Sequence, residues 1–443
     1  MEILIKASQF LLSLSLLIVL HEFGHYLPAK LFKTRVEKFY LFFDAWGKKL
    51  FSFTKGGTEY GIGWLPLGGY VKISGMIDES MDLEQMEKEP QPWEFRSKPA
   101  WQRLIIMLGG VIVNFVLGFL IYIMLFNVWG ENIVKSDDVK YGFGVAKVLE
   151  QYGVQQGDNL LLVNGEELDD ARDINNYLLL RSVQTITVKH TNGETEQIKL
   201  PEDIDMQIFQ STGMTAMTPR FPFTLDTVTE GSNAEKAGLL KTDKIIGVNE
   251  MPVTYWSDVT FGIQNSKEFV NIKVNRNDQI HDLKIELGKN GKIGIRPKPT
   301  DEDYITITKK EFSFSESITR GTSEAYWKLH DIVTQFKFVF TSKGATSLGG
   351  FIAIGNIFPS TWSWPAFWAI TAFLSLMLGF MNLLPIPALD GGHVLFTLWE
   401  MITGRKPSDK FLEYAQIGGF IFLMGLLLLA NGNDIYKWIT GQL

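Results

Sequence analysis

The chain of 443 residues contains no cysteine and only six histidines. This excludes disulfide frameworks, zinc ribbons, iron–sulfur clusters and thiol nucleophiles, so any bound metal must be held by histidine, aspartate or glutamate. Basic side chains are also in the minority, with 42 Lys and Arg against 49 Asp and Glu and a formal net charge of -7. The chain therefore lacks the basic surface expected of a nucleic-acid binder, and no nucleic acid is predicted as a partner.

Charged residues are also missing from several long apolar stretches, which we place at residues 3–20, 104–129, about 365–384 and about 414–433. Each stretch is long enough to cross a lipid bilayer as a helix. Pro359 and the Ser/Thr/Trp cluster that follows it divide the third uncharged region, which indicates an interfacial or re-entrant piece before the third span. The sequence thus predicts an α-helical membrane protein with four transmembrane helices.

The first apolar stretch could instead be a cleaved signal peptide. A signal peptide ends at a small-residue cleavage site, whereas His21 and Glu22 follow this stretch directly. We therefore interpret it as a retained span.

Lysine and arginine residues near the span ends predict the orientation. They follow span one, precede span two and follow span three, whereas residues 345–364 contain none. Because such residues concentrate on the cytoplasmic side, residues 131–364 are predicted to lie outside the cytoplasm. The orientation therefore places the domains inserted between spans two and three on the extracytoplasmic side of the membrane.

The region between spans two and three contains an internal repeat. Residues 158–165 (Asp-Asn-Leu-Leu-Leu-Val-Asn-Gly) align with residues 243–250 (Asp-Lys-Ile-Ile-Gly-Val-Asn-Glu), and Asp173 matches Asp258 at the same spacing. The two copies, at 131–221 and 222–300, resemble a tandem of bacterial PDZ domains. In the first copy residues 141–145 (Tyr-Gly-Phe-Gly-Val) would be the loop that binds a peptide carboxylate. Peptide binding and a simple spacer role both remain open.

Residues 21–25 (His-Glu-Phe-Gly-His) form the sharpest chemical motif in the chain. On a helix, His21 and His25 share one face and can ligate one Zn²⁺, and Glu22 lies beside them as a general base. Three ionisable groups at the end of an apolar span are costly in lipid, which favours a functional role. Two interfacial histidines that contact headgroups are the structural alternative.

A third ligand is expected at the end of span three, on the same side as His25. Residues 382–393 (Asn-Leu-Leu-Pro-Ile-Pro-Ala-Leu-Asp-Gly-Gly-His) contain two candidates, Asp390 and His393. The prolines break the helix and free backbone groups, which membrane proteins tolerate where the chain lines a cavity. We favour Asp390, because the double glycine is expected to begin a turn that carries His393 away.

Together these motifs resemble the site-2 protease family of zinc intramembrane metalloproteases. The resemblance covers nearly the whole chain, and it implies that His21, His25 and Asp390 ligate Zn²⁺ and that Glu22 is the catalytic acid and base. It also implies that Asn382 contacts the substrate backbone. Asn114 in span two is a further substrate-binding candidate, although Val111 stands where related sequences often have proline. A packing or interhelical role for Asn114 is an equal alternative.

Two further segments are assigned from their patterns. Residues 59–73 alternate apolar residues around a Pro/Gly turn, which predicts a hairpin that resembles the membrane re-entrant β-loop of these proteases. Val71 and Ile73 would form an edge that binds an unwound substrate. Residues 311–337 are amphipathic and would lie along the outer surface, or serve as a plain connector, within a linking region at 301–364.

The predicted function is regulated intramembrane proteolysis by a four-span zinc endopeptidase, with residues 1–130 and 365–443 forming its membrane part. The resemblance implies that its substrates are single-pass membrane proteins, namely an anti-sigma factor after a first cut or remnant signal peptides. The PDZ domains would filter access to a site near the cytoplasmic side. The alternatives are a membrane-tethered PDZ adaptor with a structural metal site and an ion carrier, although no inverted repeat supports the carrier.

Overall fold

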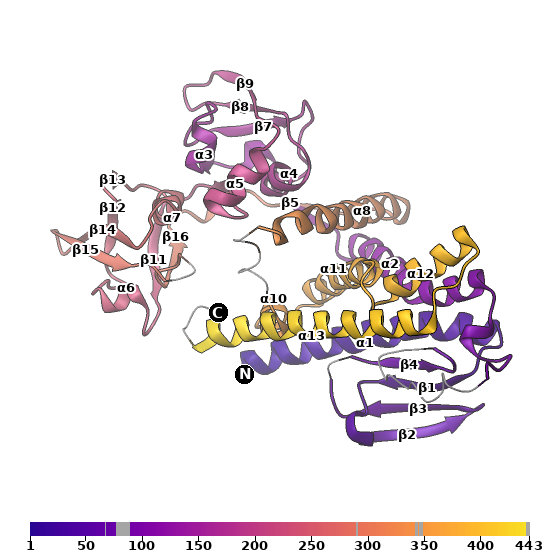
Figure 1. Ribbon diagram of the computed structural model, residues 1–443. Coiled ribbons are helices and arrows are strands. Elements are labelled where there is room, and N and C mark those ends of the chain that lie inside the picture. Colours follow the sequence, from indigo (N-terminus) through magenta and orange to yellow (C-terminus); the bar gives the residue numbers. More distant parts are fainter. Residues whose placement is uncertain (67, 77–88, 289–290, 342–343, 345–348, 440–443) are drawn as a thin grey trace. The chain divides into compact units, whose positions relative to one another are not determined.

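The computed structural model describes residues 1–443 except 67, 77–88, 289–290, 342–343, 345–348 and 440–443 (Figure 1). The chain divides into two compact units. The first consists of Met1–Trp129, Phe312–Val333 and Leu348–Asp434, and the second of Gly130–Glu311, Thr334–Ser347 and Ile435–Leu443. We describe each unit separately.

Long helices make up most of the first unit. They are α1 (Glu2–Leu31), α2 (Ala100–Trp129), α8 (Phe314–Val339), α10 (Phe351–Ile357), α11 (Trp364–Leu383), α12 (Asp390–Thr403) and α13 (Asp409–Ile439), with the last residues of α8 and α13 belonging to the second unit. Among the described residues, α1, α2, α11 and most of α13 are long and apolar enough to cross a membrane. The four predicted spans are thus confirmed, and the chain is a membrane protein.

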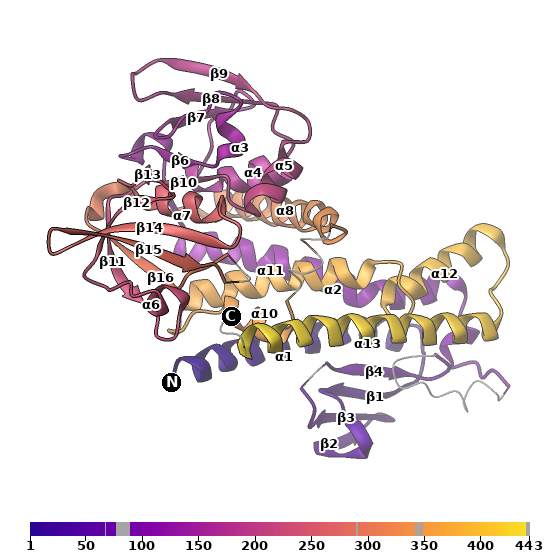
Figure 2. The ribbon, with the colours of Figure 1, turned by 60° about the vertical axis from the view of Figure 1, so that its left-hand side comes forward.

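Helix α2 is the central element of the helical bundle, because α1, α11 and α12 all pack against it (Figure 2). On the half of α2 nearer its C-terminus, apolar side chains form one buried cluster with α8 and α11, namely Ile121, Tyr122, Ala325, Ile332, Ala372 and Leu376. Near the start of α2, Ile106 and Met107 pack in another cluster with Ala29 of α1 and with the sheet described next. Both ends of α2 are therefore held in place by burial of apolar surface.

A four-stranded sheet lies beside the C-terminal half of α1 and consists of β1 (Val36–Leu41), β2 (Lys49–Lys55), β3 (Thr58–Gly63) and β4 (Tyr70–Ile73). Its strand order is β2-β3-β1-β4. The hairpin predicted over residues 59–73 is therefore wrong, because β1 separates β3 from β4 and pairs with both. Alternation of apolar residues identified the two strands, but it carries no information about which strands are neighbours.

The actual hairpin of this sheet joins β2 to β3. Lys55 pairs with Thr58, so that Gly56 and Gly57 alone form the turn, with φ of 57° and 77°. Two successive positive φ values match the twist of a two-residue hairpin loop and favour glycine at both positions. Strand β4 is left at one edge of the sheet, and it contains Val71 and Ile73.

The second unit is rich in short strands. Its strands are β5 (Glu131–Ile133), β6 (Phe143–Val145), β7 (Asn159–Val163), β8 (Thr185–Lys189), β9 (Thr195–Lys199), β10 (Met217–Pro219), β11 (Phe223–Val228), β12 (Lys244–Val248), β13 (Met251–Pro252), β14 (Phe269–Arg276), β15 (Gln279–Glu286), β16 (Ile295–Pro299) and β17 (Thr308–Lys310). Its helices are α3 (Lys147–Glu150), α4 (Ile174–Leu180), α5 (Ile204–Thr212), α6 (Asn233–Lys236) and α7 (Trp256–Gln264). Two separate apolar cores form, one mainly from residues 134–217 and one from residues 225–293.

The repeat seen in the sequence corresponds to repeated local structure. Asp158 accepts a hydrogen bond from the backbone N–H of Gln155 ahead of β7, and Asp243 accepts one from that of Leu240 ahead of β12. The asparagine after each strand, Asn164 or Asn249, has a positive φ, which asparagine tolerates better than most residues. The repeated residues are thus those that shape the ends of these strands. The domain boundaries and the PDZ assignment themselves stay predictions.

Candidate metal centre

Glycines bring α1 and α2 into close contact at the His-Glu-Phe-Gly-His motif. A Cβ atom on Gly24 would collide with the carbonyl group of Gly109, and one on Gly109 would collide with that of Gly24. A Cβ atom on Gly110 would meet the rings of both His21 and His25. Small residues let membrane helices approach closely, so these three glycines allow α2 to support the histidine pair.

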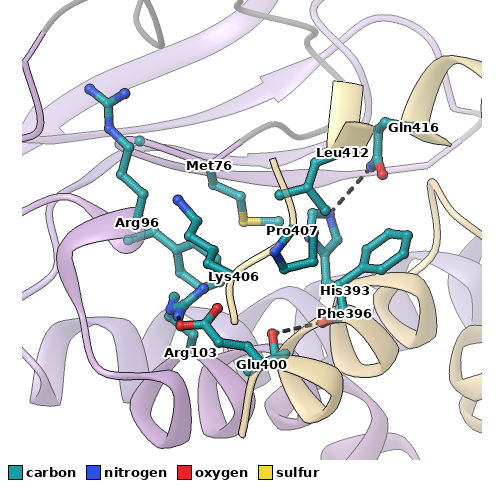
Figure 3. Close-up of a pocket in the computed structure, with 13 residues that line it drawn as sticks. Met76, Arg96, Arg103, His393, Phe396, Glu400, Lys406, Pro407, Leu412 and Gln416 are labelled. Atoms are coloured by element: carbon teal, nitrogen blue, oxygen red, sulfur yellow. Dashed lines mark hydrogen bonds and ion pairs between the residues drawn. The ribbon is translucent and has the colours of Figure 1, made fainter. Parts of the chain in front are cut away.

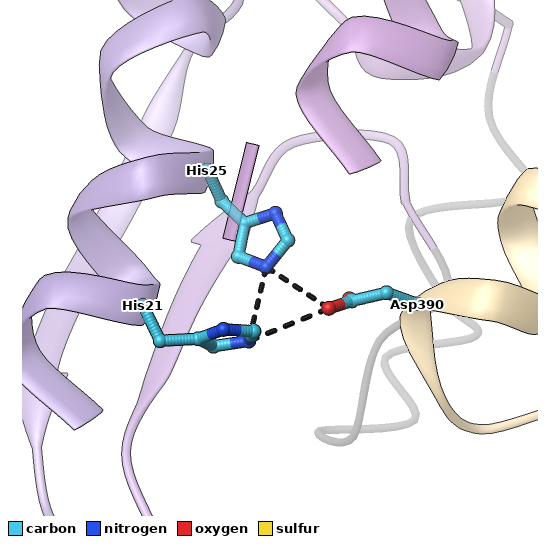
Figure 4. Close-up of side chains that lie close together, drawn as sticks. All are labelled: His21, His25 and Asp390. Carbon is cyan, nitrogen blue, oxygen red and sulfur yellow. Dashed lines mark hydrogen bonds and ion pairs between the residues drawn. The ribbon is translucent and has the colours of Figure 1, made fainter. Parts of the chain in front are cut away.

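His21, His25 and Asp390 converge on one point (Figure 4). The Nε2 atoms of His21 and His25 lie 3.3 Å apart. Asp390 Oδ2 lies 3.4 Å from Nε2 of His21 and 3.3 Å from that of His25. The two histidines are one turn apart on α1, and the carboxylate comes from the first residue of α12. Among the described residues, this is the group of three side chains that could hold a metal ion.

The arrangement fits zinc. In a tetrahedral site with metal–ligand bonds of about 2.0–2.1 Å, neighbouring ligand atoms lie about 3.3 Å apart, which is close to all three separations found here. Asp390 Oδ2 is buried and accepts no hydrogen bond from any residue that the structure describes, so its position is not explained by a donor among them. Two imidazoles and one carboxylate are a ligand set typical of catalytic zinc, which keeps a fourth position open.

The second nitrogen of each histidine also has a neighbour. His25 Nδ1 lies 2.8 Å from the backbone oxygen of Ile106, to which an Nδ1–H donates. His21 Nδ1 lies 3.0 Å from the amide nitrogen of Asn114. Such contacts orient the rings and decide which nitrogen is free to bind a metal. Asn114 is completely buried and is not among the residues that line the adjacent pocket.

The loop between α11 and α12 delivers Asp390. Residues 384–389 are not helical, and Ala388 has a φ of 76°, a left-handed conformation that is costly for a residue with a Cβ atom. Its backbone N–H donates to the side-chain oxygen of Gln416 on α13. Gly391 and Gly392 then pack their Cα atoms against backbone atoms of the same loop. This tight fit places the start of α12 beside the histidines.

The double glycine was expected to begin a turn that carries His393 away. Gly391 and Gly392 lie instead in the first turn of the helix α12. The Nε2 atom of His393 lies 3.3 Å from the amide nitrogen of Gln416. His393 is not part of the three-residue cluster. The structure thus brings Asp390, not His393, to the two histidines.

A pocket of about 630 Å³ opens next to this cluster. Its lining includes Glu22, the three clustered side chains and Asn382 near the end of α11. It also includes Gly69 and, from β4, Tyr70, Val71 and Ile73. The amide nitrogen of Asn382 lies 3.2 Å from His21 Nε2. Val71 and Ile73 are largely buried, and the backbone N–H of Val71 is directed at the Glu22 carboxylate. A potential base, a polar amide and an edge strand therefore share one cavity.

Figure 3 shows a second pocket, of about 610 Å³, which shares Met76, His393 and Gln416 with the first. Its wall contains Arg103 of α2, whose guanidinium lies 2.5 Å from the carboxylate of Glu400 on α12. This mostly buried ion pair ties the helix that begins with Asp390 to the base of α2.

Gln416 is a site residue that sequence reasoning missed. It is buried and lines both pockets. Its side-chain oxygen accepts a hydrogen bond from the backbone N–H of Ala388, in the loop before Asp390. One signal was present, since an uncharged polar residue in a transmembrane span usually faces the protein interior. Gly110 is a second such residue, because its contact with both histidine rings depends on how α1 and α2 cross.

The loop predicted to bind a peptide carboxylate has its backbone donors engaged. The N–H groups of Gly142 and Phe143 donate to the carbonyl oxygens of Val139 and Asp158. That of Val145 donates to the side chain of Gln156. These amides are therefore not aimed together at an open site, which weighs against carboxylate capture by this loop in the conformation described.

Comparison with known proteins agrees with the site. The chain is 28% identical over 457 residues to the regulator of sigma E protease of Haemophilus influenzae, covering 99% of this chain and 100% of that protein. It is 29% identical over 461 residues to regulator of sigma-E protease RseP of Escherichia coli, covering 97% and 98%. A Pasteurella multocida protein, described in its name as a candidate zinc metalloprotease, is 28% identical over 458 residues, covering 99% and 100%. The profile of peptidase family M50 matches residues 9–426, so this membrane protein belongs to peptidase family M50 and is a zinc metalloprotease.

Proposed function

We propose that the chain is an intramembrane endopeptidase that hydrolyses peptide bonds in single-pass membrane proteins, with Zn²⁺ held by His21, His25 and Asp390. One observation carries this proposal: the three ligand atoms and Glu22 line one pocket among helices that are apolar enough to span a membrane. Bound zinc polarises a carbonyl group and activates water for attack.

The protein groups around the pocket have separate tasks in this proposal. Glu22 accepts a proton from the attacking water on its carboxylate and returns it to the nitrogen of the leaving amine. Asn382 donates a hydrogen bond from its amide nitrogen to the substrate backbone. Strand β4 offers its edge, through Val71 and Ile73, to a substrate segment that has unwound from helix to extended chain.

The chain orientation supports the proposed location. Lysines and arginines flank the ends of the spans near His25 and Asp390, which predicts that the catalytic pocket lies toward the cytoplasm of a bacterial inner membrane. The second unit, with its two predicted PDZ domains, would then lie in the periplasm and filter substrate access. The names of two relatives refer to sigma E regulation, which supports an anti-sigma factor as a substrate. Remnant signal peptides are the second proposed substrate class.

Two isosteric substitutions test the proposed division of roles. Glu22→Gln removes the base and leaves the three ligands, so purified protein should keep about one zinc per chain but cut a single-pass substrate at least about 100-fold more slowly. Asp390→Asn replaces an anionic ligand with a neutral one, so zinc content should fall together with activity. Zinc is measured by elemental analysis and cleavage by gel assay in detergent.

Glu167→Gln is the matched control, because Glu167 is an exposed acidic residue of the second unit. It should change neither quantity. Full activity in Glu22→Gln protein would contradict the proposed mechanism and favour an adaptor with a structural metal site.

A further inference from the structure

Asn114 occupies an unusual position behind the metal cluster. Its side chain is completely buried, and its amide nitrogen lies 3.0 Å from His21 Nδ1. Its other polar atom, Oδ1, is buried and has no hydrogen-bond partner within the described parts of the chain. A buried oxygen without a donor is destabilising, so the contact with His21 is the one visible reason for a polar residue at this position.

The direction of this contact has a chemical consequence. An amide NH₂ group donates, and His21 faces such a group at both nitrogens, that of Asn114 at Nδ1 and that of Asn382 at Nε2. A neutral imidazole can accept at only one nitrogen, so one of the two amides must present its oxygen instead. Nε2 lies 3.4 Å from Asp390 Oδ2, so it is the nitrogen of His21 that belongs to the candidate metal cluster. A metal ligand needs a free lone pair on Nε2, which requires the proton on Nδ1 and an acceptor opposite it.

His25 already has that acceptor. Its Nδ1 faces the backbone oxygen of Ile106, and a carbonyl oxygen can only accept. Among the described residues, no backbone oxygen plays this part for His21. Its Nδ1 atom faces instead the amide of Asn114, which can donate or accept depending on which end is presented.

We propose that Asn114 is a positioning residue whose amide, by turning Oδ1 toward His21 Nδ1, holds the proton on Nδ1 and leaves Nε2 free to bind zinc. This inference rests on the proposed zinc site. A half-turn of the amide exchanges two groups of nearly equal size, so the same cavity accommodates both orientations.

The surroundings favour this role over substrate contact. Asn114 is not among the residues that line the catalytic pocket, so a bound substrate would not reach it. Its backbone oxygen accepts a hydrogen bond of 2.7 Å from Ser375 on α11. This contact holds the backbone of α2 at Asn114 against α11.

Zinc affinity of the full-length protein, measured by competition with a chromophoric chelator, tests the proposal. Asn114→Leu has similar volume but no acceptor, and the affinity should fall by about 10- to 100-fold. Asn114→Asp presents an acceptor in either orientation and should bind zinc at least as tightly as wild type. Ser375→Ala, which removes a hydrogen bond to the backbone of the same residue, should change affinity much less than Asn114→Leu.

A residue with only a packing role would give the opposite ranking, because the apolar leucine would then be tolerated better than a buried aspartate. Wild-type zinc affinity in Asn114→Leu protein overturns the inference while leaving the zinc site intact. Absence of zinc binding in the wild-type protein instead overturns the proposed function itself. If the leucine variant does not accumulate, Asn114→Ala, a size that membrane helices tolerate, takes its place with the same expectation.

Discussion

At the residue scale, the metal centre depends as much on the absence of side chains as on the ligands. Gly24, Gly109 and Gly110 leave room where any Cβ atom would meet backbone or the histidine rings. Gly24 is part of the His-Glu-Phe-Gly-His motif itself, so one residue of the motif serves helix contact instead of chemistry.

Gly24→Ala should therefore push α1 away from α2. Overpacking of this kind typically costs about 1–3 kcal/mol, and here the colliding atoms belong to backbone that cannot rotate aside. We expect a lower unfolding midpoint in detergent and a reduced zinc content. Gly425→Ala on α13 is the control, because a Cβ atom there meets nothing within 4 Å. Equal zinc content in the two variants would show that the close contact is unnecessary.

At the element scale, β4 combines an edge position with proximity to the catalytic pocket. Its partner β1 lies on one side, whereas the backbone N–H of Val71 is directed at Glu22 on the other. A substrate strand could add to this free edge through main-chain hydrogen bonds. The strand order β2-β3-β1-β4 places β4 at the edge of the sheet, next to β1. The predicted hairpin would have paired β4 with β3.

Val71→Pro removes the backbone N–H of residue 71. It should slow cleavage of a membrane substrate by about 10-fold, which corresponds to the loss of one hydrogen bond. Zinc content should stay at the wild-type level, since no ligand is changed. Val71→Ala shortens the same side chain but keeps the donor, and should retain more activity than the proline variant. Wild-type turnover by Val71→Pro protein would rule out substrate pairing at this residue.

The two repeats of the second unit differ in the cation that pairs with their equivalent aspartates. In the first, His190 contacts buried Asp158 at 2.8 Å and Glu196 at 3.0 Å. In the second, Arg276 contacts buried Asp243 at 2.6 Å. The hydrogen bond to Asp158, followed by the one to Glu196, raises the pKa of His190 above its ordinary value of about 6.5.

This difference predicts a pH dependence confined to the first repeat. Because the pKa of His190 is raised in the folded state, the protonated ring stabilises the folded first repeat fully below a pH of about 6.5. This stabilisation is lost as the pH rises through the folded-state pKa of His190. Hydrogen exchange of β7–β9 should therefore accelerate over that range relative to the intrinsic rate. Strands β12 and β14 provide an internal control, since Arg276 stays charged. A His190→Arg variant should lose the dependence, and an unchanged profile in that variant would refute this explanation.

At the scale of the whole molecule, the candidate catalytic groups are confined to one of the two units. All three candidate ligands and Glu22 belong to the first unit, and residues 130–311 supply none of them. The second unit is therefore not needed to supply a metal ligand or the proposed base.

Deletion of residues 131–300 should accordingly leave cleavage of a short model transmembrane helix within about 10-fold of wild type. Discrimination between this helix and a substrate with a bulky periplasmic domain should disappear, because the proposed filter is absent. Both substrates are compared in detergent and in reconstituted membranes. Loss of all turnover while zinc remains bound would show that the second unit has a direct part in catalysis.

The sequence by itself determined the membrane spans, the chemistry of the motif and the family, because long apolar runs and a spacing of four residues on a helix report local properties. It also indicated Asp390, through a helix-breaking segment at matching membrane depth. Tertiary structure alone decided that β1 lies between β3 and β4, that Gly110 supports both histidines, and that Gln416 and Asn114 stand behind the ligands. These contacts join residues far apart in the chain, and their geometry depends on how α1, α2, α11 and α13 pack, which no local pattern specifies.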